Sequence, residues 1–526
     1  MHSTIREIPN SIPPGTLVRL LRNEPGVVLL QSALADPRHG RYSFVAARPF
    51  LTFRSFGSRC EVSSAAEWSA DFTPGSVVHV QFGDPWQVLD ALMSRYELVD
   101  EIDLPFPLGG CFGCWGYDLK NFLEPKLPRR AANDLGLPDC HVGFYDSLVV
   151  FDHHLDKTWI VSTGLSADGT RSEERAGERM EFWQTALTNV PEGVAGGLLA
   201  IHRSPLPAAG RIQSSNRGAR SAAPYLQSSF SRADFLDRVE RAQRYIRAGD
   251  IYQVNLSQRL AARTRLSGWE LFDRLVAVSP APFAAYLDCG DFQIASSSPE
   301  MFLRLSGAHV QTRPIKGTRP RSADPARDAQ LAWELQTSPK ELAELVMITD
   351  LLRNDLGKVC DYGSVQVPDL VRLERYAQVQ HLVSTVEGRL RPDVTHLAAL
   401  KACFPGGSIT GAPKFRAMEI IDELEPVTRG PYTGALGYLG FNRESQLSII
   451  IRTAICRRQT AYFQVGAGIV ADSQPEAEYD ETLAKARGFL AALGAESPTS
   501  LSPQPTSRPV RGLGQVQGQV GRVRHA

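Results

Sequence analysis

Two pairs of glutamates, each pair three residues apart, have the types and spacing that most directly suggest chemistry. They are Glu341 and Glu344 in SPKELAEL, and Glu478 and Glu481 in PEAEYDETL. Residues at i and i+3 share one face of a helix, so each pair projects two carboxylates in one direction. Two such faces brought together would need a hard cation, and oxygen-only ligation suits Mg²⁺. The pattern predicts a Mg²⁺ site, with solvated surface charge as the alternative.

Glu341 also fits a structural role at a helix start. Ser338 is a suitable N-cap residue, and Pro339 suits the first helical position. Glu341 would then reach back to the N-cap backbone and complete a capping box. In that case Glu344 is the better direct ligand of its pair. The residues alone leave both interpretations open.

Arg452 interrupts the apolar run LSIIIRTAI, which is typical of a buried strand. Burying a charged side chain is costly unless it is paired, so Arg452 should meet an anion from the protein or from a ligand. Arginine suits bidentate recognition of a carboxylate. An edge strand or an internal salt bridge is the alternative.

Two glycine-rich stretches could bring the backbone close to a ligand. Residues 406–411 lead through Lys414 into the helical run FRAMEIIDELE. Free N–H groups at a helix start attract anions, and a lysine there opposes the helix dipole unless an anion binds. Gly466, Ala467 and Gly468 follow the strand-like run YFQV and would also allow close approach.

Three further side chains could take part in proton transfer or nucleophilic attack. Glu300 precedes the apolar run MFL, and a carboxyl group entering an apolar segment can have a raised pKa and donate a proton. His381 lies in the strand-like run QVQHLVS, where a hydrogen-bonded structural histidine is the alternative. Lys316, in PIKGT, is either a functional amine or an exposed turn lysine.

The bulk composition is that of an ordinary globular protein. At 526 residues, two domains or subdomains are expected. The 57 acidic and 57 basic residues balance, so net charge predicts neither a nucleic-acid nor a membrane partner. No signal-peptide pattern and no uncharged apolar run of about 18 residues occurs, which predicts a cytoplasmic protein.

The eight cysteines predict neither a zinc site nor a nucleophile. Only Cys111 and Cys114 form a CxxC, and no second pair has zinc-ligand spacing. Flanking glycines give this stretch the outline of a nucleophile elbow, but the His-x-Glu of glutamine amidotransferases is absent from the sequence. We therefore expect reduced thiols and a glycine-rich strand or turn.

The sequence divides into four segments. Residues 1–190 mix short strand-like and helical runs, and residues 191–230 have the composition of a flexible linker or long loop. Residues 231–494 begin with an amphipathic helix after Ser231 and alternate strands with helices. Residues 495–526 are rich in Gly, Gln, Pro and Ser, as expected of a disordered tail.

Together these segments resemble the chorismate-utilising enzymes, which include anthranilate synthase component I, aminodeoxychorismate synthase component I, isochorismate synthase and salicylate synthase. The matching motifs follow the family order between Gly249 and Ala486: GDIYQVNLSQR, SSSPEMFL, RPIKGTRPR, KELAELVMITDLLRNDLGKV, HLVSTVEG, FPGGSITGAPK, GALGYLGF, IIIRTAI, GAGIV and DSQPEAEYDETLAKA. The resemblance implies an α/β (α+β) fold with two large antiparallel sheets packed face to face and helices outside.

The resemblance also implies roles for individual residues. Glu344 and Glu481 match direct Mg²⁺ ligands, and Glu341 and Glu478 match outer carboxylates that hold metal-bound water. Glu300 matches the general acid that protonates the departing C4 hydroxyl of chorismate. The residues implied to bind substrate are Gln253, Thr318, Ser408, Lys414, Tyr438, Arg452, Gly466, Ala467 and Gly468.

Two positions distinguish the branches of the family. Gln253 stands where isochorismate and salicylate synthases have a water-activating lysine, so ammonia is favoured over water as the nucleophile. Lys316 stands where anthranilate synthases have alanine and aminodeoxychorismate synthases have a lysine thought to attack C2 of chorismate. His381 matches an active-site histidine of both amino-transferring branches. The expected activity is aminodeoxychorismate synthase component I, with anthranilate synthase component I as the enzymatic alternative and a non-catalytic, amino-acid-binding regulatory subunit as the other.

The resemblance further implies a partner and a second pocket. The family commonly takes ammonia from a separate glutamine amidotransferase subunit, and this sequence has no amidotransferase motif of its own. LLQS and RYSF resemble the family's N-terminal amino-acid pocket, which would include Ser32, Tyr42 and Ser43, with Gln31 where many members have glutamate. A shared structural motif is the alternative.

Overall fold

The computed structural model describes residues 2–9, 12–32, 40–64, 79–98, 103–188, 226–376, 378–495 and 502–503. Most of the predicted linker at 191–230 and of the predicted tail at 495–526 lies outside these residues. The described end of the linker segment forms strand β11 (Leu226–Ser228), which pairs with β12 (Gln253–Arg263).

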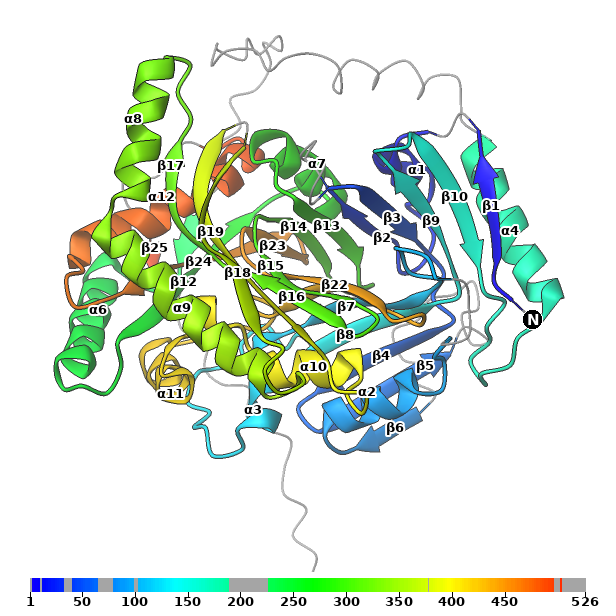
Figure 1. Cartoon of the computed structure of the whole chain (residues 1–526), viewed down its shortest axis with the longest axis horizontal. Helices are drawn as coiled ribbons and strands as arrows, with labels where there is room; N and C mark the ends of the chain where they lie inside the picture. Colours follow the sequence, from blue (N-terminus) through cyan, green and yellow to red (C-terminus); the bar gives the residue numbers. More distant parts are fainter. Residues whose placement is uncertain are drawn as a thin grey trace, which may run out of the picture.

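The described strands form two large sheets (Figure 1). The larger, 13-stranded sheet runs in the order β1 (Thr4–Ile8), β10 (Lys157–Ser162), β9 (Ser147–Asp152), β3 (Tyr42–Ala46), β2 (Val28–Gln31), β13 (Phe283–Asp288), β14 (Gln293–Ser298), β23 (Thr453–Arg457), β24 (Thr460–Ile469), β12, β11 and β25 (Ser502–Pro503), with β20 (Gly411–Ala412) beside β12. Its pairs are antiparallel except β11 with β25.

The smaller sheet has 12 described strands and is antiparallel throughout. Its order is β17 (Ile315–Pro320), β19 (Val379–Arg389), β16 (His309–Arg313), β15 (Met301–Ser306), β22 (Glu444–Ile449), β21 (Ala435–Gly440), β7 (Gly110–Trp115), β8 (Cys140–Tyr145), β4 (Leu51–Phe56), β5 (Arg59–Ser64) and β6 (His79–Phe82), with β18 (Gln366–Arg375) beside β19.

The N-terminal and C-terminal parts of the sequence are interleaved in both sheets. In the larger sheet β2 pairs with β13, where Leu30 lies opposite Ala285. In the smaller sheet β7 pairs with β21, where Phe112 lies opposite Tyr438. The residues on either side of the linker segment therefore share both sheets and do not form separate sheets of their own.

The main hydrophobic core lies between the two sheets. Phe44 of β3 packs edge-to-face on Tyr438 of β21, with ring centroids 5.2 Å apart. Ile294 of β14 and Phe53 of β4 belong to the same buried cluster. Burial of this apolar surface is the main force that holds the sheets together. The predicted arrangement of two antiparallel sheets packed face to face is confirmed.

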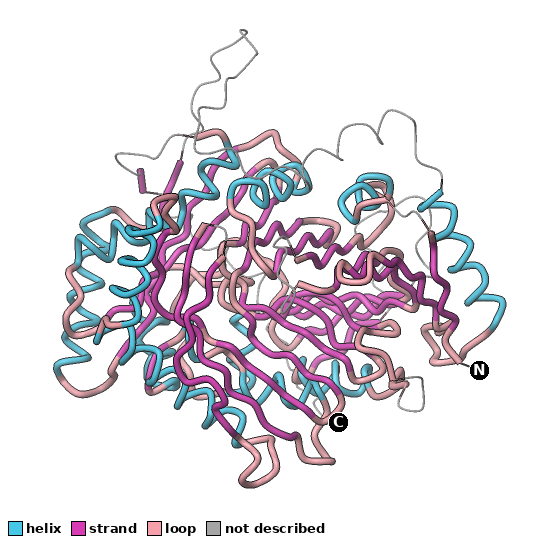
Figure 2. The backbone as a smooth tube through the Cα atoms, turned by 45° about the horizontal axis from the view of Figure 1, so that its top comes forward, coloured by secondary structure: helices cyan, strands magenta, loops and turns pink. Residues whose placement is uncertain are grey.

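Helices surround the sheets, as the tube view shows (Figure 2). The described α-helices are α1 (Pro14–Leu20), α2 (Pro85–Met93), α3 (Lys120–Leu123), α4 (Glu173–Thr188), α6 (Arg232–Arg247), α7 (Gly268–Val278), α8 (Pro325–Gln336), α9 (Pro339–Gly357), α10 (His396–Cys403), α11 (Lys414–Leu424) and α12 (Pro475–Leu493). Leu17, Trp183, Leu271 and Phe489 bury the apolar faces of α1, α4, α7 and α12 against the larger sheet. Among these described helices, none combines the length and apolar character needed to cross a membrane.

Local sequence signals set two helix ends as expected. Ser231 caps α6, and Asp234 completes a capping box by bonding back to the Ser231 backbone. Gly494 ends α12 in a left-handed conformation with φ 72°, which glycine adopts without a Cβ penalty. The eight cysteines are buried and unpaired, which fits the expectation of reduced thiols.

Candidate active site

Most of the predicted site residues meet where α9 packs on β17 and β19 and where α12 packs on β24. In Figure 1 these two helices lie on the same side of the molecule as β17 and β19. The short 3₁₀ helix η3 (Gly407–Ile409) lies beside α9. One site is therefore built from elements that are far apart in the sequence.

Lys316 lies in β17 and points toward α9. Its Nζ is 4.0 Å from Oε2 of Glu344 and donates a long hydrogen bond of 3.5 Å to the carbonyl oxygen of Ser408. The side chain is only 14% exposed, so it is not the exposed turn lysine of the alternative interpretation. Gly317 follows with φ 67° and sits against Glu341, where a Cβ would lie 3.0 Å from the carboxylate Oε2.

Glu300 lies in the turn between β14 and β15 and is buried. Burial raises the pKa of its carboxyl group above the ordinary value, while the Ser408 hydroxyl and the charge of Lys316 partly oppose the shift. A carboxyl group with a raised pKa is suited to donate a proton near neutral pH. The geometry is consistent with the predicted general acid.

The glutamates of α9 and α12 influence one another electrostatically. Burial raises the pKa of Glu344, and the charges of Glu341 and Glu481 raise it further, against the lowering effects of Lys316 and Lys340. Burial also raises the pKa of Glu478, opposed by a hydrogen bond from Ser473, and Glu481 adds to the rise. Glu344 of α9 and Glu481 of α12 are thus close enough to influence each other electrostatically.

These carboxylates do not form a closed metal cage. Within the described ranges, no group of three or more His, Cys, Asp or Glu side chains is close enough to hold a metal ion. Glu481 is 48% exposed and pairs with Lys485 at 2.7 Å, and Glu478 accepts a 2.6 Å hydrogen bond from the Ser473 hydroxyl. The donor set fits Mg²⁺ chemically, because it is all oxygen and its negative charges oppose one another.

The capping-box interpretation of Glu341 is only half right. Ser338 is the N-cap of α9, and its hydroxyl accepts from the Glu341 backbone N–H. The Glu341 side chain does not return the bond but lies 3.4 Å from Nη1 of Arg319 on β17. Glu341 is therefore turned toward the site and remains available as an outer carboxylate.

His381 lies in β19, as expected, and is buried. Its Nδ1 is 2.9 Å from the hydroxyl of Thr318, which lies opposite it in β17. Burial and the nearby positive charge of Arg452 lower its pKa to about 4, so the ring is neutral at physiological pH. The histidine is hydrogen-bonded and also faces the site, so the two interpretations are compatible.

Arg452 is not inside a strand. It lies between β22 and β23 with φ 50°, because the chain leaves one sheet and enters the other at this point. Its backbone carbonyl accepts from Ser297, in the run that leads to Glu300. Burial lowers the pKa of its guanidinium, and no carboxylate of the described residues pairs with it. The internal salt bridge is therefore absent from the described part of the chain, and the guanidinium is available to an anionic ligand.

The backbone of β24 closes the site on another side. A Cβ on Gly468 would lie 2.6 Å from Nε2 of Gln253, which is buried and donates to Oε2 of Glu344 at 3.4 Å. The carbonyl oxygen of Gly466 accepts from Lys485 at 2.8 Å. Ala467 differs, because its side chain belongs to the core beneath the strand, so only its backbone could contact a ligand.

Tyr432 belongs to this site but was not predicted. A Cβ on Gly466 would lie 2.9 Å from Oη of Tyr432 and 2.5 Å from Oδ1 of Asn255, and that amide oxygen is buried without a hydrogen-bond partner. The sequence signal was available, since Tyr432 lies in the same stretch, PYTGALGY, as Tyr438.

Two predicted substrate-binding residues lie elsewhere. Tyr438 is in β21, where its ring stacks on Phe112 of the neighbouring strand and meets Phe44 of the larger sheet. Lys414 begins α11 but donates to the Asp355 carboxylate at 2.5 Å and to the carbonyl oxygen of Cys403 at 3.1 Å. The anion that Lys414 requires is thus a protein carboxylate.

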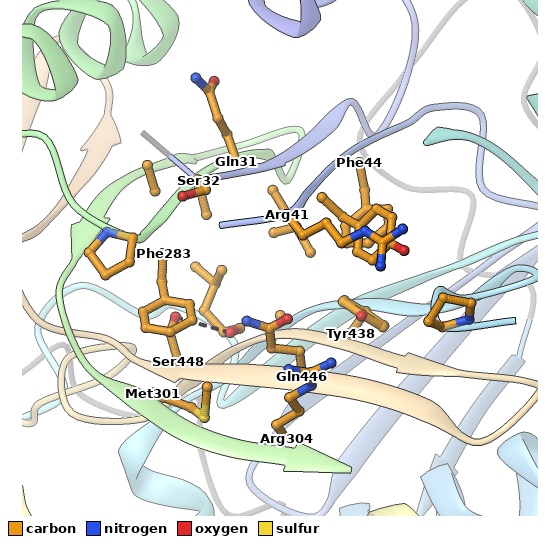
Figure 3. Close-up of a pocket in the computed structure, with 18 residues that line it drawn as sticks. Gln31, Ser32, Arg41, Phe44, Phe283, Met301, Arg304, Tyr438, Gln446 and Ser448 are labelled. Atoms are coloured by element: carbon orange, nitrogen blue, oxygen red, sulfur yellow. Dashed lines mark hydrogen bonds between the residues drawn. The ribbon is translucent and has the colours of Figure 1, made fainter. Parts of the chain in front are cut away.

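Tyr438 lines a separate cavity of about 160 Å³ between the sheets (Figure 3). Ser32 and Tyr42, two of the residues predicted for an amino-acid pocket, also line this cavity. Ser43 does not, because alternate residues of a strand face opposite ways and its hydroxyl bonds to His153 at 2.6 Å. The labelled side chains around the cavity are Gln31, Ser32, Arg41, Phe44, Phe283, Met301, Arg304, Tyr438, Gln446 and Ser448.

Comparison with known proteins places the chain in a family. The family described as chorismate binding enzyme matches residues 40–491. This chain is a member of that family.

The most similar relatives carry two different names. Anthranilate synthase component 1 of Acetivibrio thermocellus is 38% identical over 485 residues, covering 91% of this chain and 92% of the relative. Aminodeoxychorismate synthase component 1 of Salmonella typhimurium is 39% identical over 469 residues, covering 89% and 92%. The crystal structure of anthranilate synthase component I from Streptococcus pneumoniae matches with a TM-score of 0.69 and 30% identity, covering 87% of this chain and 93% of that one. The chain therefore belongs to the chorismate-utilising enzymes, and overall identity does not separate the two amino-transferring activities.

Proposed function

We propose that this chain is an aminodeoxychorismate synthase component 1, which converts chorismate and ammonia to 4-amino-4-deoxychorismate. The observation that carries this proposal is the position of Lys316. Its amine lies 4.0 Å from Glu344 and close enough to Glu300 to influence the pKa of that carboxyl group. A lysine between the proposed general acid and the proposed metal ligands is positioned to react with the substrate.

Arg452 and the β24 backbone are proposed to bind the carboxylates of chorismate. The guanidinium of Arg452 has no carboxylate partner among the described residues, which supports a role in anion binding. Gly466 leaves space next to Tyr432 and Asn255 that a side chain at this position would fill. Thr318 bonds to His381 and thereby orients its ring, and the Ser408 hydroxyl lies close enough to Glu300 to lower the pKa of that carboxyl group.

Mg²⁺ is proposed to bind between α9 and α12. Glu344 and Glu481 would be direct ligands, and Glu341 and Glu478 would hold metal-bound water. When bound, the ion would neutralise these carboxylates and bind the ring carboxylate of the substrate. The raised pKa of Glu344, to which two neighbouring carboxylates contribute, supports the need for such a counter-charge.

The reaction proposed for Lys316 proceeds by two substitutions. The neutral amine attacks C2 of chorismate, and the two conjugated ring double bonds shift to C1=C6 and C4=C5. The C4–O bond breaks as Glu300 protonates the departing hydroxyl, which leaves as water. Ammonia then attacks C4, both ring double bonds shift back, and the C2–N bond breaks with the lysine leaving as the neutral amine. The Glu300 carboxylate takes up the proton that the new ammonium group loses. The enolpyruvyl group stays in place throughout.

The proposed nucleophile at C4 is ammonia, supplied by a glutamine amidotransferase partner. The side-chain amide of Gln253 contacts the carboxylate of Glu344. An amide cannot deprotonate water. This supports amination over hydroxylation. The product would then serve p-aminobenzoate and folate synthesis.

Anthranilate synthase component 1 is the second candidate. It is favoured by the Acetivibrio thermocellus relative, which is as similar to this chain as the aminodeoxychorismate synthases are. The two candidates differ in whether pyruvate leaves after amination.

A product assay separates the candidates. Purified protein would be incubated with chorismate, Mg²⁺ and an ammonium salt at mildly alkaline pH. Anthranilate would be read by its fluorescence, and p-aminobenzoate would be read after addition of aminodeoxychorismate lyase. We expect p-aminobenzoate that depends on the lyase, without anthranilate. Anthranilate as the main product would overturn the proposal and favour the second candidate.

A further inference from the structure

A buried ion pair bonds to segments that carry groups of the proposed active site. Arg429 and Glu425 are each only 4% exposed. Nε and Nη2 of Arg429 donate to the two carboxylate oxygens of Glu425 at 2.9 and 2.7 Å, in a bidentate arrangement. Removing two charges from water is costly, and such a pair contributes little net stability compared with apolar side chains of similar size. A role other than stabilising the fold is therefore needed to explain the pair.

The remaining donors of Arg429 bind three separate segments of the site. Nη1 donates to the carbonyl oxygen of Ile409 at 3.1 Å and to the hydroxyl of Thr433 at 3.2 Å. Nη2 donates to the carbonyl oxygen of Asn255 at 2.8 Å. The planar guanidinium is suited to holding several acceptors in a fixed geometry, which a lysine could not reproduce.

Each of these segments carries a group placed in the site. Ile409 is adjacent to Ser408, whose hydroxyl is close enough to Glu300 to lower the pKa of that carboxyl group and whose carbonyl oxygen accepts from Lys316. Thr433 follows Tyr432, and the Arg429 guanidinium also lies 5.6 Å from the Tyr432 ring centroid.

Glu425 ties the same pair to β12. Its Oε1 accepts from the backbone N–H of Ser257 at 2.9 Å and from the Ser257 hydroxyl at 2.8 Å. Ser257 pairs with Gly466 in the antiparallel ladder between β12 and β24. The ion pair thus fixes the strand that lies next to the substrate-facing backbone of β24.

We propose that Arg429, held by Glu425, is a positioning residue that sets the mutual placement of Ser408, Tyr432 and the β12–β24 backbone for turnover of chorismate. This inference rests on the proposed function for the identity of the reaction. Arg429 bonds to neither Lys316 nor Glu300, so it acts through Ser408. A displacement of about 1 Å at reacting groups can reduce a rate by about 100-fold.

Two variants separate positioning from stability. Arg429→Met removes all the donors and leaves Glu425 as an unpaired buried carboxylate. The double variant Arg429→Met with Glu425→Gln removes that unpaired charge and keeps an acceptor for Ser257. We expect the single variant to lose both thermal stability and turnover. We expect the double variant to regain stability while its kcat stays at least about tenfold below the wild type, with a smaller change in KM.

Asp146→Asn provides the matched control. Asp146 is also buried and pairs with Arg175 and Arg179 at 2.9 and 3.2 Å, in the N-terminal region and outside the proposed site. This variant should lose stability while retaining kcat and KM. If the double variant regains turnover together with stability, or if the control loses turnover equally, the positioning role is overturned.

A measurement independent of turnover tests the same inference. Hydrogen exchange of the backbone in residues 406–412 and 253–257 should be faster in the double variant than in the wild type, and unchanged in Asp146→Asn. Equal exchange in the wild type and the double variant would contradict the inference. In these variants turnover is followed as chorismate consumption, which does not depend on which product forms. The proposed function is tested separately, by the identity of the product that the wild type makes.

Discussion

The proposed active site and the cavity between the sheets differ in whether an arginine side chain is paired with a carboxylate. At the cavity, Arg41 pairs with the buried carboxylate of Asp152 at 2.8 Å, and the lining is largely apolar. In the active site, Arg452 has no carboxylate partner among the described residues, and Glu344 lies close to two further carboxylates. At the cavity Arg41 is paired within the protein, whereas in the active site Arg452 is left to be met by a ligand.

This difference indicates that the cavity region mainly stabilises the fold and that the active-site region mainly serves binding and reaction. Paired charges and close-packed rings stabilise a fold, while an unpaired and partly buried charge such as that of Arg452 is favoured where a ligand requires it. The cavity is also built from both ends of the chain, since Tyr42 comes from β3 and Tyr438 from β21. The active-site groups come from residues 253–485 alone. Variants in the two regions should therefore affect stability and turnover in opposite proportions.

The largest expected effect is the loss of amination in Lys316→Ala. Removal of the proposed nucleophile should lower the rate of aminodeoxychorismate formation by at least about 1,000-fold, or divert the reaction to anthranilate. The products would be separated chromatographically after incubation with chorismate, Mg²⁺ and ammonium. Stability should change little, because the only described partners of Lys316 are long contacts to Glu344 and Ser408.

Phe283→Leu, in the cavity, is the control for Lys316→Ala. It changes the lining of the other region and should leave the product unchanged. Undiminished aminodeoxychorismate formation by Lys316→Ala would rule out the covalent route while leaving the metal and anion sites intact.

Protonation of His381 at acidic pH should lower the free energy of unfolding of the protein. Its folded pKa is about 4, well below the ordinary value of about 6.5, because of burial first and of Arg452 second. The unfolded chain binds the proton more readily, so the stability contribution is complete above about pH 6.5 and is lost as pH falls toward 4. The loss amounts to about 3 kcal/mol, measured by urea unfolding across this range. His381→Asn should flatten that part of the profile.

His396 supplies a matched comparison for the acid experiment. Burial lowers its pKa to about 4 as well, and its ring bonds to Ser445 and to the carbonyl oxygen of Gly307, each at 2.8 Å. His396→Gln should flatten the stability profile to a similar extent and leave kcat unchanged, whereas His381→Asn should lower kcat. Equal kcat in the two variants would remove His381 from the site.

Replacing the two arginines should change stability in opposite directions. Arg452→Met removes an unpaired charge, so the free energy of unfolding should rise by about 1 kcal/mol. The same variant loses a charge-assisted contact to a substrate carboxylate, so kcat/KM should fall by about 100-fold. Arg41→Met deprives the buried Asp152 of its partner and should lower the free energy of unfolding by about 1 kcal/mol. Chemical denaturation and steady-state kinetics on both variants test this contrast.

A lower stability of Arg452→Met would mean that its guanidinium is satisfied within the protein. The contrast between the two regions would then fail at its central point, whatever the effect on kinetics.

The fold was predicted correctly, and the site predictions are most specific where the signal is local and linear. Glu300, Lys316 and the two ExxE faces lie in short motifs whose spacing decides their direction. The two-sheet architecture followed from a resemblance that covers most of the chain. Propensity or spacing alone would not have interleaved β2 with β13, because such pairings join residues more than 250 positions apart.

The errors arose where a partner lies far away in the sequence. Lys414 was expected to bind a ligand. Its actual partner, Asp355, could not be recognised from the local sequence because it lies 59 positions earlier. Tyr438 was predicted to bind substrate, but β21 begins at Ala435 and carries Tyr438 to the cavity. Arg452 was assigned to a strand because nothing in LSIIIRTAI marks the positive φ at which the chain changes sheets. These are properties of tertiary packing, not of local pattern.

Ser43→Ala should produce the smallest effect and tests which way β3 faces. The Ser43 hydroxyl is buried and lies 2.6 Å from Nε2 of His153, on the face of β3 opposite the cavity. Its loss should lower the free energy of unfolding by about 1 kcal/mol and leave turnover unchanged. Tyr42→Ala, one residue earlier, should instead alter the cavity and the binding of any molecule that occupies it. If Ser43→Ala changed such binding as strongly as Tyr42→Ala does, the two side chains would have to share the cavity, and the alternation along β3 would be wrong.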